Sequence, residues 1–228
     1  MASPDSPNVA SEADAAAAPA DLGARFQRTW ERLHSHDPAA IYRVLARFYG
    51  QPHRHYHTLA HVEDCLREVD AFHAAEPTFL SAEMWHAVEL ALWFHDVIHQ
   101  PRADDNEERS ADIFDAIASA AMVPPRFIAA VRRLILATKF DTPSATAEEQ
   151  VIIDCDLASL GYAPPDFRRS GIAIRKEYGF VPDGDFVEAR RATLLRLNQR
   201  PGIFRTDFMR QRYEHQARAN LTAALASL

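Results

Sequence analysis

The sequence has few cysteines, no excess of positive charge and no long hydrophobic run. Its two cysteines, Cys65 and Cys155, lie in apolar helical patterns, which indicates reduced core thiols and a cytoplasmic location rather than a disulfide framework. The formal net charge of −7 argues against a nucleic-acid partner, because proteins of that kind carry a basic binding face. No apolar stretch approaches the roughly 18 to 20 residues that cross a bilayer, so no membrane span is expected.

The length and composition predict one globular domain, or at most two small ones. The chain has 228 residues, of which 47% are hydrophobic, so it can bury a sizeable core. Residues 1–20 have no basic start and no apolar run, and acidic residues interrupt them, which indicates a disordered tail rather than a signal peptide. Residues 21–228 are expected to form a single domain.

The hydrophobic pattern is helical almost throughout. Apolar residues recur every three or four positions from Asp21 onward, with no sustained period of two, which predicts an all-α fold. Asp37 and Pro38 are typical of a helix start and predict a helix through Arg47. A histidine-bearing loop follows, and the next helix is expected to begin near His57. Further helices are expected at about residues 80–99, 104–121, 124–139, 147–160, 165–178, 184–198 and 206–226.

The segment EMWHAVELALWFHDVIHQP contains the adjacent pair His95 and Asp96. His95 shares a helical stripe with Val88 and Ala91, so it is expected to face the core. Asp96 lies in the same apolar segment, where a carboxylate is costly unless a cation or hydrogen bonds compensate it. An isolated pair of this kind is most simply interpreted as a neutral core histidine beside an aspartate that bonds a neighbouring helix. A functional interpretation of the pair therefore requires further metal-binding residues elsewhere in the sequence.

Two further segments carry groups that can bind a metal. In YHTLAHV, His57 and His61 are four residues apart and would lie about 40° apart on a helix. In EEQVIIDCDLASLG, Asp154 and Asp156 lie on nearly opposite faces, and Asp156 shares its face with apolar residues. Imidazole nitrogen together with carboxylate oxygen suits a divalent first-row metal, so three such segments on separate helices form a coherent set.

The order of these motifs resembles the HD-domain metal-dependent phosphohydrolase superfamily. The segments RHYHTLAHV, FHDVIHQPRADDNEERSA, DCDLASLG, IRKEYGFVPDGDF and EHQARANL together resemble one small stand-alone bacterial branch of it, over about residues 21–226. Most of that branch is described only as predicted phosphohydrolases. The resemblance implies a single HD-type helical domain with a buried metal site.

The resemblance also implies roles for individual residues. The metal ligands would be His61, His95, Asp96 and Asp156, with Asp96 acting catalytically as the bridge if a second ion binds. YHTLAH is also similar to the histidine pair of cyclic-nucleotide phosphodiesterases, in which the first histidine gives a proton to the leaving group. That similarity assigns general-acid catalysis to His57 and metal binding to His61.

The number of metal ions follows from a departure from the larger HD enzymes, which carry additional histidine ligands. This chain has no histidine from Gln100 through Glu214, and Phe140 and Asp141 stand where a further ligand would be expected. We therefore expect one tightly held divalent ion, drawn from Mn, Fe, Zn, Ni, Co and Mg, and a weaker second one. Glu107 or Asp141 could supply oxygen to the second ion.

The remaining candidates each have a simpler interpretation. His99, Glu107 and Asp154 could support the ligands or a second ion, but an acidic helix start explains Glu107 and a core position explains His99. Any of the candidates for phosphate binding could equally be solvated; they are Arg54, Arg109, Lys139, Arg175, Lys176 and Tyr178. The five arginines between Arg190 and Arg205 alternate with apolar residues and are interpreted as part of an amphipathic outer helix.

These residues predict hydrolysis of a phosphate ester or anhydride by a metal-activated water, with a small phosphorylated substrate such as a nucleotide. His57 would protonate the departing oxygen. A non-catalytic nucleotide and metal sensor that uses the same pocket is the alternative. A helical interaction protein with structural histidines is a third interpretation and explains the three segments less well. The oligomeric state, a homodimer included, stays open.

Overall fold

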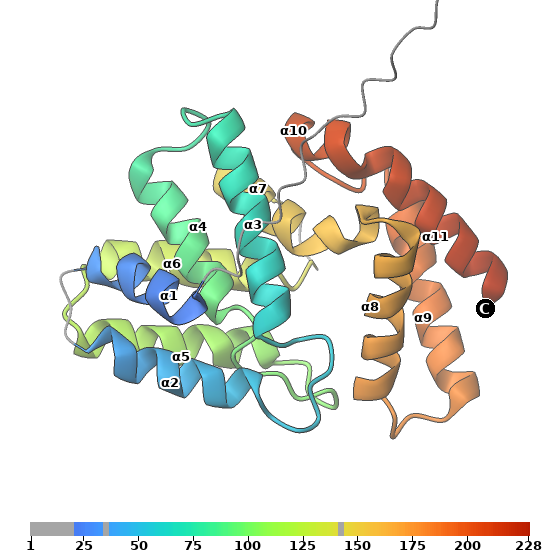
Figure 1. Cartoon of the computed structure of the whole chain (residues 1–228), viewed down its shortest axis with the longest axis horizontal. Coiled ribbons are helices and arrows are strands. Elements are labelled where there is room, and N and C mark those ends of the chain that lie inside the picture. Colours follow the sequence, from blue (N-terminus) through green and yellow to red (C-terminus); the bar gives the residue numbers. More distant parts are fainter. Residues whose placement is uncertain (1–20, 34–36, 141–143) are drawn as a thin grey trace, which may run out of the picture.

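The computed structural model describes residues 21–33, 37–140 and 144–228, and these residues form helices and connecting loops with no strand (Figure 1). The all-α prediction is therefore confirmed. The predicted tail at residues 1–20 and the candidate Asp141 lie outside the described residues. Within the described ranges, no helix combines the length and apolarity that a membrane crossing requires.

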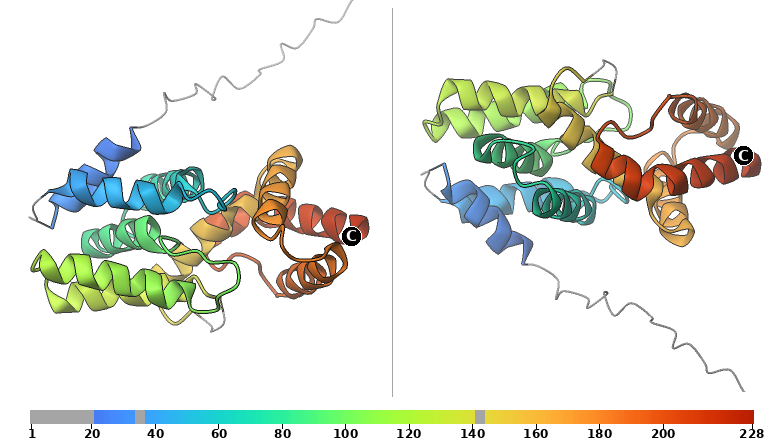
Figure 2. Two further views of the ribbon diagram at one scale, coloured as in Figure 1. Left: turned by 90° about the horizontal axis from the view of Figure 1, so that it is seen from below. Right: turned by 90° about the horizontal axis from the view of Figure 1, so that it is seen from above.

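The helices fall into two groups along the chain. The first group consists of α1 (Leu22–Glu31), α2 (Pro38–Tyr49), α3 (Leu59–Ala75), α4 (Ala82–Phe94), α5 (Asn106–Ala120), α6 (Pro125–Ala137) and α7 (Ala147–Asp156). A 3₁₀ turn (Leu157–Gly161) leads to the second group, which consists of α8 (Pro164–Glu177), α9 (Asp183–Asn198), the short α10 (Asp207–Met209), a π-helical turn (Arg210–Glu214) and α11 (His215–Ser227). Figure 2 shows α8, α9 and α11 together at one end of the molecule.

Helix α4 forms the centre of the first group. Its sequence is mostly apolar, with buried residues around its circumference, and it packs against α1, α3, α5, α6 and α7. Aromatic rings surround its end: Trp93 packs edge-on against Phe26 at 5.2 Å between ring centroids, and Phe94 packs against Phe114 at 5.1 Å. The segment that follows α4 therefore leaves the core from a fixed point.

Three of the helix boundaries that differ from the predicted ones fall at candidate site residues. Helix α4 ends at Phe94, so His95 and Asp96 lie in a turn rather than within a helix through residue 99. Helix α3 begins at Leu59, so His57 precedes it and does not share a helix face with His61. Helix α7 ends at Asp156, where the chain tightens into the 3₁₀ turn.

The 3₁₀ turn joins the two groups. It packs against α8 and α11, and the side-chain amide of Asn220 on α11 donates hydrogen bonds to the carbonyls of Leu160 and Tyr162, at 2.8 and 2.9 Å. Gly161 allows the π-helical turn to approach the 3₁₀ turn closely, because a Cβ on residue 161 would lie 2.5 Å from the Cβ of Tyr213. The C-terminal end of α7, which carries Asp156, is therefore fixed where the groups meet.

Candidate metal centre

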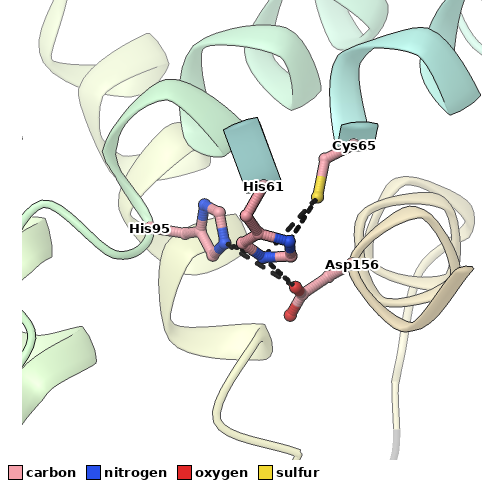
Figure 3. A group of neighbouring side chains, drawn as sticks. All are labelled: His61, Cys65, His95 and Asp156. Atoms are coloured by element: carbon pink, nitrogen blue, oxygen red, sulfur yellow. Dashed lines mark hydrogen bonds and ion pairs between the residues drawn. The ribbon is translucent and has the colours of Figure 1, made fainter. Parts of the chain in front are cut away.

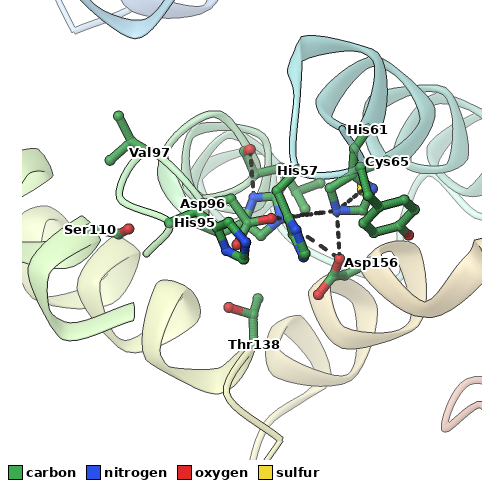
Figure 4. A network of polar contacts seen from close by, with 12 residues as sticks. His57, His61, Cys65, His95, Asp96, Val97, Ser110, Thr138 and Asp156 are labelled. Carbon is green, nitrogen blue, oxygen red and sulfur yellow. Dashed lines mark hydrogen bonds and ion pairs between the residues drawn. The ribbon is translucent and has the colours of Figure 1, made fainter. Parts of the chain in front are cut away.

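Three elements of the first group bring four predicted ligands together. His61 lies in the first turn of α3, His95 and Asp96 follow α4, and Asp156 ends α7. His61 Nε2 is 2.9 Å from Asp156 Oδ1 and 3.7 Å from Asp96 Oδ2. His95 Nε2 is 3.0 Å from Asp96 Oδ2, 3.7 Å from Asp156 Oδ1 and 3.3 Å from His61 Nε2. Figure 3 shows the two imidazoles facing the carboxylate of Asp156, and Figure 4 shows Asp96 beside them.

The protonation of His95 is set by its backbone contact. His95 Nδ1 lies 2.9 Å from the carbonyl oxygen of Leu92, which can only accept, so Nδ1 carries the proton. In the neutral ring the lone pair of Nε2 therefore points toward the other ligand atoms. A backbone hydrogen bond of this kind orients a metal-binding imidazole and fixes its tautomer.

The spacing of these atoms fits a divalent ion. Around an ion with bonds of about 2.0 to 2.2 Å, neighbouring ligand atoms are about 2.8 to 3.6 Å apart in tetrahedral or octahedral geometry. The separations of 2.9, 3.0 and 3.3 Å lie within that range, and the two separations of 3.7 Å exceed it by about 0.1 Å. Two nitrogens and two oxygens suit several first-row metals, so this donor set fits a divalent ion without selecting one.

The charges of the cluster also favour a bound cation. Burial alone would raise the pKa of Asp156, but hydrogen bonds with His61 and His95 outweigh it and lower that pKa to about 2. Asp96 behaves in the same way: its pKa lies well below the usual range, since the charge of His95 outweighs burial. Burial disfavours the His95 imidazolium, but the two carboxylates raise its pKa well above the usual value. Two ionised carboxylates thus demand positive charge, which protons or a metal can supply.

Cys65 is a neighbour of this cluster that the sequence did not single out as a ligand. Its sulfur is equally distant, at 3.7 Å, from both ring nitrogens of His61, so it is not aligned with the lone pair of either nitrogen. Burial, and after it the charge of Asp156, raises the pKa of the Cys65 thiol well above its usual value. Asp96 Oδ2, which lies 3.0 Å from His95 Nε2 and 3.7 Å from His61 Nε2, is the better placed fourth candidate ligand. Both cysteines are buried free thiols, as predicted.

Glu177 is the functional residue that sequence reasoning missed. It ends α8 and is buried, and its Oε1 accepts hydrogen bonds from the backbone N–H groups of His55, Tyr56 and His57 at 2.8, 2.7 and 2.9 Å. Its Oε2 lies 2.6 Å from His57 Nδ1. Burial raises the pKa of Glu177, but the hydrogen bond from His57 outweighs that effect and the pKa lies well below its usual value. An ionised carboxylate therefore holds the histidine loop in place.

The contact with Glu177 orients His57 at the edge of the cluster. Because the carboxylate accepts from Nδ1, the Nε2 of His57 is the nitrogen left for other partners. The His57 side chain is 21% exposed, and its ring stacks on that of His99 at 3.9 Å between centroids. His57, His99 and Glu177 form a second group of potential ligand atoms. We interpret His99 as supporting His57, because its ring stacks on that of His57 and its Nε2 lies 3.4 Å from Oε2 of the same Glu177.

A cavity of about 370 Å³ opens beside both groups. His57, Asp96 and Asp156 line it, together with Glu107 from the start of α5 and Tyr178. Burial, and after it the charge of Asp96, raises the pKa of Glu107. Four cations also line this cavity: Lys139, Arg190, Arg196 and Arg200. Lys139 forms an ion pair with Glu108 at 2.6 Å, whereas the three arginines come from α9 and the loop after it.

Two arginines predicted to bind phosphate are occupied by backbone carbonyls. Buried Arg54 donates through Nη1 to the carbonyls of Asp96 (2.6 Å) and His57 (3.1 Å), and through Nη2 to that of Val97 (2.8 Å). Its role is to join the loop before α3 to the turn after α4. Arg175 donates to the carbonyls of Tyr178 and Val181, at 2.6 and 2.9 Å, and so closes the C-terminal end of α8.

Three other candidates lie away from the cavity. Arg109 is exposed and 3.8 Å from Asp105, and Lys176 is exposed at the end of α8. The predicted support of the metal by Asp154 is wrong, because its carboxylate accepts hydrogen bonds from the backbone of Arg205 and from the backbone and hydroxyl of Thr206, at 2.7 to 2.9 Å. Asp154 anchors the segment before α10, on the opposite face of α7 from Asp156.

Comparison of the chain with protein-family models, with curated proteins and with solved structures finds no match in any of the three.

Proposed function

We propose that the protein is a metal-dependent phosphohydrolase with a single HD-type helical domain, and that it hydrolyses a phosphate ester or anhydride of a small metabolite. One observation carries the proposal: Nε2 of each of two imidazoles, His61 and His95, lies within 3.7 Å of an oxygen of both Asp96 and Asp156, beside a cavity that His57 also lines. The resemblance of the motifs to HD-domain phosphohydrolases agrees with this ligand set.

The residues of the cavity divide the work. His61, His95, Asp96 and Asp156 would hold the ion, which when bound activates water and offsets charge on the phosphate oxygens. His57 has its Nδ1 bound to Glu177 and its Nε2 left for the substrate, so in the protonated state it can give a proton to the departing oxygen.

The contacts around His57 also favour turnover over sensing. A sensor needs the ligands and the cavity, but it has no need for a solvent-accessible imidazole held by a buried carboxylate. Glu177 makes three hydrogen bonds to the backbone and one to the ring, so the structure fixes the direction of His57 as well as its place. General acid catalysis requires such a fixed direction.

The test measures bound metal and hydrolysis together. Protein purified without chelator should contain a divalent ion in stoichiometric amount and should release phosphate from members of a nucleotide panel when manganese is added. The double substitution of His95→Ala with Asp96→Ala should abolish both. His73→Ala, a change of an exposed histidine on α3, is the matched control and should alter neither.

The alternatives predict different results from the same samples. Unchanged metal content and activity in the double variant would overturn the proposal. A nucleotide that binds stoichiometrically and is recovered intact after incubation with metal would establish the sensor instead. Protein that contains no stoichiometric metal would point to structural histidines.

A further inference from the structure

One side of the cavity is formed by arginines of α9 and the loop after it. Arg190, Thr193, Arg196, Leu197 and Arg200 all line the cavity, and their spacing of three to four residues places them along one side of this segment. We call Arg190, Arg196 and Arg200 the α9 arginines. The acidic lining comes from other elements, namely the ends of α4 and α7 and the start of α5. The cavity therefore has an acidic part and a basic part.

The α9 arginines have no anionic partner within the described ranges of the chain. The Nη1 of Arg200 is shielded from solvent and makes no hydrogen bond there. Burial lowers the pKa of Arg200, and the neighbouring charge of Arg196 lowers it further. Burial also lowers the pKa of Arg190. Positive groups that are partly desolvated and unpaired are costly, and an anion that binds between them would remove the cost.

This basic part begins next to the metal centre. Arg190 lines the same cavity as Tyr56, and the centroid of the Tyr56 ring is 4.8 Å from that of His61 and 4.9 Å from that of His57. From Arg190 to Arg200 the chain advances by ten residues, or about 15 Å at the helical rise. A single phosphate held at the metal centre would not occupy three guanidinium groups spread over that length, because each can bind phosphate oxygens in a bidentate manner.

We propose that the α9 arginines bind phosphate groups of the substrate other than the one that is attacked, so that the substrate class is a small molecule with a chain of two or more phosphates. This inference rests on the proposed function for the identity of the attacked group. The arginine site itself does not rest on the proposed function, because its positive charges come from residues other than the candidate metal ligands.

The first test is a binding measurement that does not depend on hydrolysis. Inorganic tripolyphosphate and orthophosphate are titrated into the full-length protein by calorimetry, with the metal content measured before and after. Tripolyphosphate should bind more tightly than orthophosphate by about tenfold or more, and Arg190→Gln and Arg200→Gln should each remove most of that difference. Arg191→Gln is the matched control, because its guanidinium contacts the Leu225 carbonyl at 3.3 Å and does not line the cavity.

The second test separates this inference from the proposed function. In the wild type, kcat/KM should be higher for ATP than for AMP, and Arg200→Gln should lower the value for ATP by about tenfold or more while that for AMP and the metal content stay unchanged. If both arginine variants bind tripolyphosphate as the wild type does, the inference is wrong, whatever the activity. If tripolyphosphate binding depends on the arginines but no nucleotide is hydrolysed, the arginine site stands and the hydrolytic function fails.

Discussion

Helices α1–α7 and helices α8–α11 contribute opposite kinds of chemistry to one cavity. The first group supplies the four candidate metal ligands from elements that pack around α4, most of whose side chains are buried. The second group supplies Glu177 and the α9 arginines from helices that bury few side chains: Phe167 and Glu177 on α8, and Leu194 and Leu197 on α9. Metal ligands need fixed positions within a few tenths of an ångström, whereas flexible guanidinium groups adapt to an anion. The difference in packing therefore matches the difference in task.

Substitution of His57 tests whether the two groups of helices act together. Among changes that leave the ion bound, it should lower the rate of hydrolysis most. His57→Ala should slow turnover by about 10² to 10⁴, the usual contribution of a general acid, because Nε2 is the nitrogen available to the leaving group. Steady-state kinetics and metal analysis on the same sample measure both quantities. If the variant instead loses the ion, then the roles of His57 and His61 are exchanged.

Glu177 is the point at which α8 controls His57. Glu177→Gln removes the negative charge next to His57 Nδ1 and should lower stability at neutral pH by about 1 to 3 kcal/mol, because a buried donor loses its ionised acceptor. The rate should fall as well, since the ring is no longer held in one direction. Denaturant unfolding and kinetics at pH 7 check both effects, with Glu31→Gln, a change of an exposed carboxylate, as the control.

The pH dependence of stability has a definite sign at Glu177. Its pKa in the folded protein is lower than the ordinary value of 4.5, so its contribution is present above pH 4.5 and is lost as the pH falls further toward the folded value. The stability difference between wild type and Glu177→Gln should therefore shrink as the pH is lowered from 7 to about 3. A difference that stays constant over this range would show that the charge of Glu177 is not what holds the loop.

Arg54 tests a connection within the first group. Arg54→Lys cannot donate in the planar arrangement that reaches the carbonyls of His57, Asp96 and Val97, so unfolding should become easier by about 2 to 3 kcal/mol. Because the guanidinium faces carbonyls, we expect kcat to fall and KM to change little. A rise in KM with unchanged stability would instead indicate that Arg54 binds phosphate. Arg47→Lys is the control, because Arg47 is exposed on α2.

The helical periodicity of the sequence was sufficient to predict the all-helical fold, and the resemblance of its motifs selected the four candidate ligands whose side chains the structure brings together. His95 and Asp156 lie on apolar helical stripes, so burial of groups that bind metals could be inferred without the tertiary structure. The position of His57 could not, because the backbone before α3 bonds to a carboxylate about 120 residues later rather than continuing the helix. Long-range contacts of that kind leave no periodic signal near His57.

Glu177 and the α9 arginines show what limits such predictions. Glu177 recurs with Phe167 and Ile174 on one side of α8, so a buried carboxylate could have been recognised there. The arginines have the spacing of an ordinary amphipathic helix, and only the tertiary arrangement shows that Arg190 and Arg200 face a cavity. Arg54 was misassigned because its partners are backbone carbonyls, which every residue possesses.

Cys65 should have the smallest effect, and it tests the composition of the metal centre. Its sulfur belongs to the same group of atoms as His61, His95 and Asp156, so a ligand set with Cys65 in place of Asp96 would be the alternative. The sulfur is 3.7 Å from both ring nitrogens of His61, whereas Asp96 Oδ2 is 3.0 Å from His95 Nε2. Cys65→Ala should therefore retain the metal and the activity, and cobalt-substituted wild type should lack a thiolate-to-metal charge-transfer band. Cys155→Ala provides a buried control on α7. Loss of the ion only in Cys65→Ala would identify sulfur as a ligand and would leave Asp96 free for another role in the cavity.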